Sequence, residues 1–185
     1  LTKEPIAAQE EKAKTEARQE VFADAVSFTD AENFDTQAAQ TVLDAGGFTG
    51  CSIDEYAAAC DADGNLLGYV ITVTTHGGYS GDIQFTIGVQ NDGTLNGMSI
   101  LSISETAGLG MRAEEVLVPQ FAGKKADSFV YTKSGASADN EIDAISSATI
   151  TTSAVVDGVN AGLYYFQTEL MQQTGAAQEG GSVDE

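Results

Sequence analysis

Six side-chain hydroxyls crowd into one short stretch of this sequence, from Ser146 to Ser153, just after the acid Asp143. Behind them, apolar residues recur at steps of three and four. They are Ala154, Val155, Val156, Val159, Leu163, Phe166 and Leu170. This spacing predicts a helix with one buried stripe that begins near Ser153. We therefore expect the hydroxyls at a helix N-terminus.

Hydroxyls at a helix N-terminus have two interpretations. Ser and Thr side chains cap helices by accepting hydrogen bonds from the unpaired N–H groups of the first turn. One or two hydroxyls are enough for that purpose, and this stretch has more. The alternative is an anion site, because free amides and the positive end of the helix dipole both face a ligand there. Phosphate is the obvious anion, and the residues alone leave both interpretations open.

The run from Asp143 to Thr149 resembles a flavinylation motif, Asp-x-x-(Ser/Thr)-Gly-Ala-Thr, of the covalent FMN-binding domain family. This family includes the G subunit of the Rnf electron-transport complex and the C subunit of the sodium-translocating NADH:quinone oxidoreductase, and the likeness to the Rnf protein is closer. The resemblance implies that Thr149 carries FMN through a phosphoester. The other cofactor-binding residues expected in this stretch are Asp143, Ser146, Ser147, Ala148, Thr151 and Thr152.

Ser147 departs from the motif, because it stands where the family has Gly. If the position requires a positive φ or a close approach of the phosphate, Ser suits it less well than Gly. In that case we expect slow flavin attachment or none.

A second stretch, Glu105–Gly110, resembles the family's Glu-Thr-Pro-Gly-Leu-Gly loop, with Ala107 in place of Pro. Taken alone, its glycines suit either an ordinary strand-to-helix turn or the approach of backbone to a flat ligand. With the resemblance, we expect Glu105, Thr106, Leu109 and Gly110 to help bind the flavin. Shorter matches at 68–70, 78–81 and 120–124 extend the likeness over roughly residues 65 to 165.

The period of the apolar pattern changes to two after residue 51, which predicts strands. The predicted strands lie near 52–60, 66–75, 81–90 and 95–104, with tight turns at Asp63-Gly64 and Asp92-Gly93. We also predict a short helix near 36–44, a helix over 113–124 interrupted at Pro119, and a strand over 128–133. The fold class is therefore α+β: a twisted antiparallel sheet with helices packed mainly on one face and the C-terminal helix beginning at the flavin site.

At 185 residues the chain fits one domain with flanking segments. Residues 1–20 are rich in helix formers with a thin apolar face, so we expect a solvated helix. The resemblance implies that residues 21–172 form the FMN-binding domain, and residues 173–185 are expected to be a disordered tail. No apolar run is long enough to span a bilayer. The chain opens with Leu1, and the resemblance implies that a membrane anchor precedes it and that the domain lies on the extracytoplasmic side of the cell membrane.

The net charge of −20, from 28 acids and 8 bases, excludes partners that depend on contacts to a nucleic-acid backbone. The acidity indicates either solubility or a preference for basic partners or a salty setting. We expect no metal site, because His76 is the one histidine and the two cysteines lack zinc-site spacing. A strand from Cys51 to Cys60 would hold the cysteines about 30 Å apart, so we predict two free or buried thiols.

The resemblance implies an electron carrier with no catalytic residue of its own. Its FMN would be attached by a separate Mg²⁺-dependent flavin transferase that uses FAD, because a threonine alcohol is a poor nucleophile unaided. The partners would be the other membrane subunits of an Rnf-type ion-pumping ferredoxin:NAD oxidoreductase complex. Two alternatives stay open: a stand-alone flavinylated extracytoplasmic redox protein, and a non-redox binding module of the same fold that has lost attachment.

Overall fold

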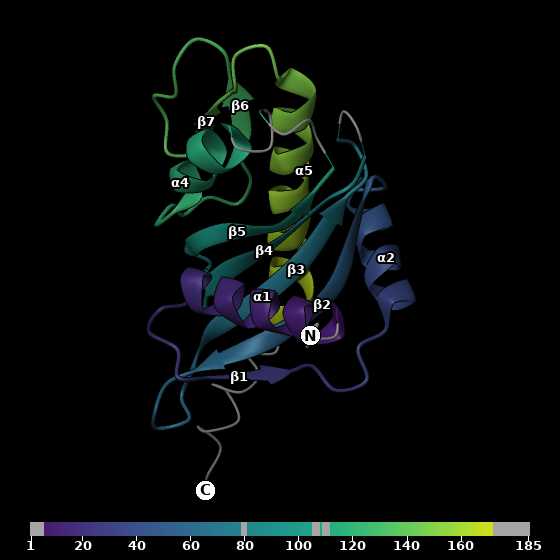
Figure 1. The fold of residues 1–185 in the computed structure, drawn as a ribbon, viewed down its shortest axis with the longest axis vertical. Coiled ribbons are helices and arrows are strands. Elements are labelled where there is room, and N and C mark those ends of the chain that lie inside the picture. Colours follow the sequence, from purple (N-terminus) through teal and green to yellow (C-terminus); the bar gives the residue numbers. More distant parts are fainter. Residues whose placement is uncertain (1–5, 79–80, 105–107, 109–111, 172–185) are drawn as a thin grey trace, which may run out of the picture.

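The computed structural model describes residues 6–78, 81–104, 108 and 112–171, and its centre is a five-stranded antiparallel sheet (Figure 1). The strands pair in sequence order. They are β1 (Ser27–Asp30), β2 (Cys51–Cys60), β3 (Leu66–Thr75), β4 (Ile83–Gln90) and β5 (Leu95–Ile103). The predicted four-strand meander is confirmed, and β1 adds a fifth strand at its edge.

The two predicted hairpin turns are built from aspartate and glycine. Gly64 and Gly93 both have positive φ, at 84° and 91°. The carboxylate of Asp61 accepts hydrogen bonds from the N–H groups of Asp63 and Asn65, each at 2.9 Å. Because the side chain replaces missing backbone partners, these residues favour the turn over continued strand.

One face of the sheet carries the main core and is covered by α5 (Thr149–Tyr165) and α2 (Thr36–Ala45). A one-turn π-helix, η2 (Phe166–Leu170), continues α5. Gly158 and Gly162 let α5 lie close to the sheet: a Cβ at either position would stand 2.7 Å from Phe85 or Ile87. The α+β class and the predicted short helix near 36–44 are thereby confirmed.

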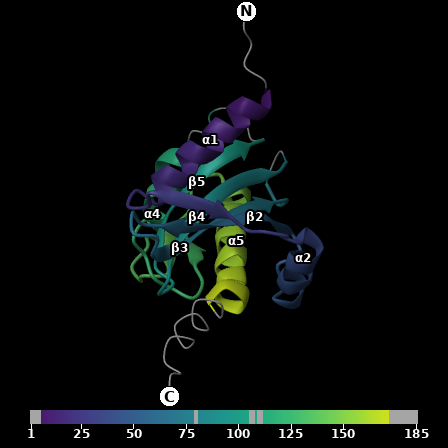
Figure 2. The ribbon, with the colours of Figure 1, turned by 90° about the horizontal axis from the view of Figure 1, so that it is seen from below.

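The other face is crossed by α1 (Ile6–Val21), so the helices lie on both sides of the sheet (Figure 2). Val21 and Phe22 pack with Ala59 and Val70 in a second, smaller apolar cluster. The end of α1 lies close to β4, since a Cβ on Gly88 would stand 2.5 Å from the Val21 carbonyl oxygen. Residues 8–13 of α1 are exposed, whereas Val21 and the following Phe22 are buried against the sheet.

A small lobe comes after β5 and lies beside the start of α5 (Figure 1). It contains a π-helical turn η1 (Ala113–Leu117), the short helix α4 (Val118–Phe121) and two parallel strands, β6 (Val130–Thr132) and β7 (Glu141–Asp143). Asn160 on α5 fixes the lobe by bonding both the N–H and the C=O of Phe129, at 2.7 and 2.8 Å. The predicted helix over 113–124 and strand over 128–133 correspond to its helices and to β6, whereas β7 was not predicted.

Both cysteines are free thiols at opposite ends of β2, as predicted. Cys51 is buried, and burial raises its pKa to about 11. Within the part of the chain that the structure describes, no helix has the length and apolar character to cross a membrane.

Candidate functional site

The candidate site is the connection between β7 and α5. Strand β7 ends at Asp143, a turn comes next, and α5 begins at Thr149. The helix therefore starts four residues before the predicted Ser153. The pattern of apolar residues could not reveal this earlier start, because Ile150 in the first turn is 53% exposed. The expected hydroxyl cluster at a helix N-terminus is confirmed, with Thr149 as the first helical residue.

Ser147 has a φ of +65°, in the left-handed region that glycine adopts readily. Among the described residues other than glycine, only Asn33 shares a positive φ. Position 147 therefore does require a positive φ, which was the condition under which Ser was expected to suit the motif less well than Gly. The family's Gly adopts this conformation at low cost. Ser147 nevertheless takes it up, so the turn forms with a strained residue.

The hydroxyls do not form a simple cap. The residue before the helix is Ala148, whose side chain has no group to cap the first-turn N–H groups. Thr152 points its hydroxyl back to the turn instead, donating to the Ala148 carbonyl at 2.9 Å and accepting from the Ile145 N–H at 3.1 Å. The Ala148 N–H itself donates to the Ile145 carbonyl at 3.0 Å. These bonds hold the turn over residues 145–148 closed at the start of α5.

The threonines of the stretch differ in access to solvent. Thr151 and Thr152 have no exposed surface, whereas Thr149 is partly exposed. Ser146 and Ser147 are exposed, and Ala148 is buried. Of the three threonines only Thr149 can be reached from solvent, at the end of a helix whose dipole favours an anion.

Gln120 holds Asp143 in place, a role that the sequence did not reveal. Its side-chain oxygen accepts from the Asp143 N–H at 2.7 Å, and its side-chain nitrogen donates to the Asp143 carbonyl at 3.0 Å. The Asp143 carboxylate accepts from the N–H of Ala136. The signal in the sequence was the short match to the family at 120–124. This match includes Gln120 but indicates no role for it.

The predicted flavin contacts of Glu105, Thr106, Leu109 and Gly110 lie outside the described residues. The next described element along the chain is η1, which contacts both β7 and α5. The four flavin contacts stay predictions.

The family model described as FMN-binding domain matches residues 78–164, which includes this turn and most of α5. Residues 78–164 of this chain are therefore similar to the FMN-binding domain family. No group of three or more His, Cys, Asp or Glu side chains that could hold a metal ion is found among the described residues.

Curated relatives of this chain are named as G subunits of ion-translocating complexes. The G subunit of the Na⁺-translocating ferredoxin:NAD⁺ oxidoreductase complex of Acetobacterium woodii is 36% identical over 108 residues, covering 57% of this chain and 52% of the relative. The G subunit of the ion-translocating oxidoreductase complex of Escherichia coli is 38% identical, covering 55% and 52%. Its namesake in Methanosarcina acetivorans is 33% identical, covering 65% and 66%. The chain thus spans about half the length of the first two relatives.

The crystal structure of Shewanella oneidensis NqrC has a similar fold, with a TM-score of 0.53 over 66% of this chain and 61% of that one. Sequence identity is 24%, so this likeness concerns the fold. It agrees with the α+β architecture of an FMN-binding domain built on an antiparallel sheet.

The turn before α5 fits the phosphate end of FMN. It offers the start of a 17-residue helix without a side-chain cap at Ala148, exposed hydroxyls on Ser146 and Ser147, and a partly exposed Thr149. Phosphate favours such a position because helix N-termini present N–H groups and a positive partial charge. The exposed apolar side chain of Ile150 stands next to Thr149 in the same turn.

Proposed function

We propose that this chain is an electron-carrier domain with FMN attached covalently to Thr149 through a phosphoester. The observation that carries this proposal is the placement of Thr149. It is the partly exposed first residue of α5, and it comes after a left-handed turn at Ser147. When bound, FMN supplies exchange of one or two electrons, while the protein supplies its position and electrostatic surroundings.

The residues of the turn have separate tasks in this proposal. The N-terminus of α5 stabilises the phosphoester's negative charge, which matters in a chain with a net charge of −20. Ser146 and Ser147 hold hydroxyl donors on the solvent side. Asp143, fixed by Gln120, sets the direction in which the chain enters the turn.

Attachment needs a separate flavin transferase, because an unassisted threonine hydroxyl is a weak nucleophile. The bond that forms joins Thr149 Oγ1 to the phosphorus of the FMN half of FAD. The bond that breaks joins the two phosphates of FAD, AMP leaves with its phosphate, and the hydroxyl proton passes to a base of the transferase. Neither electrons nor an oxidant are required.

The names of the relatives support a place for the domain in an ion-translocating oxidoreductase complex. We propose that it works as the G subunit of an Rnf-type complex, held at the cell membrane on the extracytoplasmic side and exchanging electrons with neighbouring subunits. A stand-alone flavinylated protein is the alternative. It predicts a genome neighbourhood without genes for the other subunits of the complex.

The test is co-expression of the 185-residue chain with a flavin transferase, followed by intact mass and visible absorbance. The wild type and Ser137→Ala, which changes an exposed serine outside the turn, should each gain the mass of FMN less one water and turn yellow. Thr149→Ala should show neither change, because it lacks the acceptor oxygen while keeping the fold. A wild type that stays colourless and unmodified beside a flavinylated control substrate would favour the non-redox binding module.

A further inference from the structure

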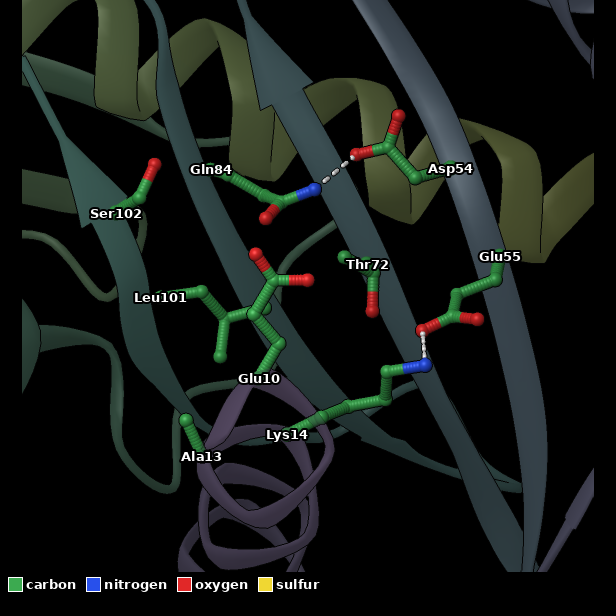
Figure 3. Close-up of a pocket in the computed structure, with 9 residues that line it drawn as sticks. All are labelled: Glu10, Ala13, Lys14, Asp54, Glu55, Thr72, Gln84, Leu101 and Ser102. Carbon is green, nitrogen blue, oxygen red and sulfur yellow. Dashed lines mark hydrogen bonds and ion pairs between the residues drawn. The ribbon is translucent and has the colours of Figure 1, made fainter. Parts of the chain in front are cut away.

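A cleft of about 550 Å³ lies between α1 and the sheet (Figure 3). Helix α1 crosses the face of the sheet opposite α5 (Figure 2). The C-terminal turns of α1 pack on the sheet, while its earlier turns border the cleft. Its lining is largely polar: Glu10, Ala13, Lys14, Asp54, Glu55, Thr72, Gln84, Leu101 and Ser102. None of these residues belongs to the turn around Thr149, so the cleft is separate from the flavin site.

Two of the three carboxylates in the cleft have no cationic partner among the described residues. Glu55 is neutralised by Lys14 at 2.9 Å and lies 3.8 Å from Arg18. Asp54 accepts hydrogen bonds from the neutral side chains of Thr74 and Gln84, which orient it without cancelling its charge. Glu10 reaches in from α1 (Figure 3). The free charge of the cleft is therefore negative and comes from Glu10 and Asp54.

Thr72 gives a second, independent sign of a ligand. Its side chain is 3% exposed, yet its hydroxyl has no hydrogen-bond partner among the described residues. Figure 3 shows this hydroxyl pointing into the cleft. The buried side-chain atoms without a partner among the described residues are Arg18 Nε and Asn91 Oδ1, so the Thr72 oxygen is open to the cleft and can bond a polar group that enters it.

The size and lining of the cleft select the chemistry of that group. The acids do not form a metal-binding group within the described residues, which favours an extended cation over a single ion. Ala13 and Leu101 provide apolar surface for a hydrocarbon stem. Arg and Lys side chains combine such a stem with a cationic, hydrogen-bonding tip.

We propose that this cleft is a docking site for an arginine- or lysine-bearing segment of a partner protein. The cationic group lies between Glu10 and Asp54 and donates a hydrogen bond to Thr72, while its stem packs on Leu101. Lys14 already makes this kind of contact inside the chain, where its hydrogen bond to Glu55 raises the pKa of Lys14. The net charge of −20 attracts basic partners to the domain, and the cleft provides a specific binding site for them.

The test is a titration of the isotope-labelled 185-residue chain with acetyl-Arg-Arg-Arg-amide at physiological salt, followed by amide chemical shifts. The largest shifts should fall on Asp54, Thr72, Gln84 and Ser102. Glu10→Gln/Asp54→Asn should weaken binding about tenfold. The control variant Glu16→Gln/Asp24→Asn removes the same charge from exposed acids outside the cleft. It should change the affinity for the peptide by less than about twofold.

Thr72→Val separates ligand binding from a structural role. It removes a hydroxyl that has no partner among the described residues, so the melting temperature should stay the same or rise while peptide affinity falls about threefold. Three results would overturn the proposal: equal losses in the two double variants, shifts scattered over the whole acidic surface, or tighter binding of spermidine than of the peptide.

Discussion

Ser147 occupies a backbone conformation that costs a non-glycine residue of order 1 kcal/mol or more. Its φ of +65° is held by its surroundings, since the Ala148 N–H and the Thr152 hydroxyl close the turn on either side. The serine therefore preserves the geometry of the motif while making it less stable. This explains how the chain can depart from the family pattern and still present Thr149 at the start of α5.

Ser147→Gly should raise the free energy of unfolding by about 0.5–1 kcal/mol, because relief of strain exceeds the added entropy of the unfolded chain. Urea denaturation measures this change, and the same variant should incorporate FMN faster. Ser146→Gly is the matched control. Its φ is not positive, so it should lose stability, and a loss in both variants would contradict the strain at Ser147.

The two thiols should differ in reactivity. Cys51 is 3% exposed and its pKa is raised to about 11 by burial, whereas Cys60 is partly exposed. A thiol-reactive disulfide reagent at about pH 8 should label Cys60 at least about tenfold faster than Cys51, and Cys60→Ser should leave only the slow phase. Equal rates would mean that β2 opens at its Cys51 end.

Burial of Cys51 also sets the sign of a pH effect. Because its pKa is raised, the folded state keeps the thiol proton up to about pH 11, while the unfolded chain releases it near the ordinary pKa of 9.0. The contribution of this group to stability is therefore present below about pH 9 and is lost as the pH rises toward about 11. Denaturation at several alkaline pH values should show the decline in the wild type and less of it in Cys51→Val.

At the scale of elements, α5 positions the site through close packing on the sheet and through two side-chain clamps. Gly158 and Gly162 bring it against Phe85 and Ile87. Asn160 ties the small lobe to α5, and Gln120 ties α4 to the end of β7. The start of α5 and the end of β7 are thereby held in one arrangement around the turn.

Gly158→Ala should destabilise the protein by about 1–3 kcal/mol although Ala is the better helix former. The reason is the new Cβ, which would stand 2.7 Å from the fully buried ring of Phe85. Gly97→Ala places its Cβ in open space and should be neutral or stabilising. Thermal unfolding compares them, and an unchanged Gly158→Ala would show that α5 is less tightly packed than described.

Gln120→Met keeps the length of the side chain and removes both hydrogen bonds to Asp143. We expect a loss of about 1–2 kcal/mol in stability, since the variant loses these two exposed bonds and the partly buried bond from Gln120 to the Val116 carbonyl. If Gln120 also positions Asp143 for flavin attachment, FMN incorporation into the variant should slow as well, at temperatures where the variant is folded. Normal incorporation at reduced stability would assign Gln120 a purely structural part.

The sequence predicted the elements that have a strong period and missed those that do not. β2 to β5 alternate, and Asp-Gly turns join β2 to β3 and β4 to β5, so the bounds of these strands were predicted within one or two residues. β1 and β7 have four and three residues, too few for a period to show. The contact of α1 with the sheet depends on Val21, Phe22 and the close approach at Gly88, which only the fold brings together. The family's Gly at position 147 indicated that a positive φ could be required there. The hydrogen bonds between Gln120 and Asp143 could not be inferred from the sequence and are seen only in the structure.

At the scale of the whole molecule, the chain presents two separate surfaces. The turn that carries Thr149 lies at one end of α5, and the acidic cleft lies under α1 across the sheet (Figures 1 and 3). An electron carrier that works among several partner proteins needs both an exposed redox group and a surface that binds those partners. The arrangement allows a basic partner segment to occupy the cleft without covering the flavin site.

The most direct measurement is the location of the flavin on the chain. The wild-type protein, purified after co-expression with a flavin transferase, would be digested, and the peptide spanning Asp143 to Thr152 fragmented in a mass spectrometer. The account predicts FMN on Thr149 alone, the one partly exposed threonine at the start of α5. FMN on Ser146 or Ser147, or a peptide with no flavin from a yellow protein, would contradict it.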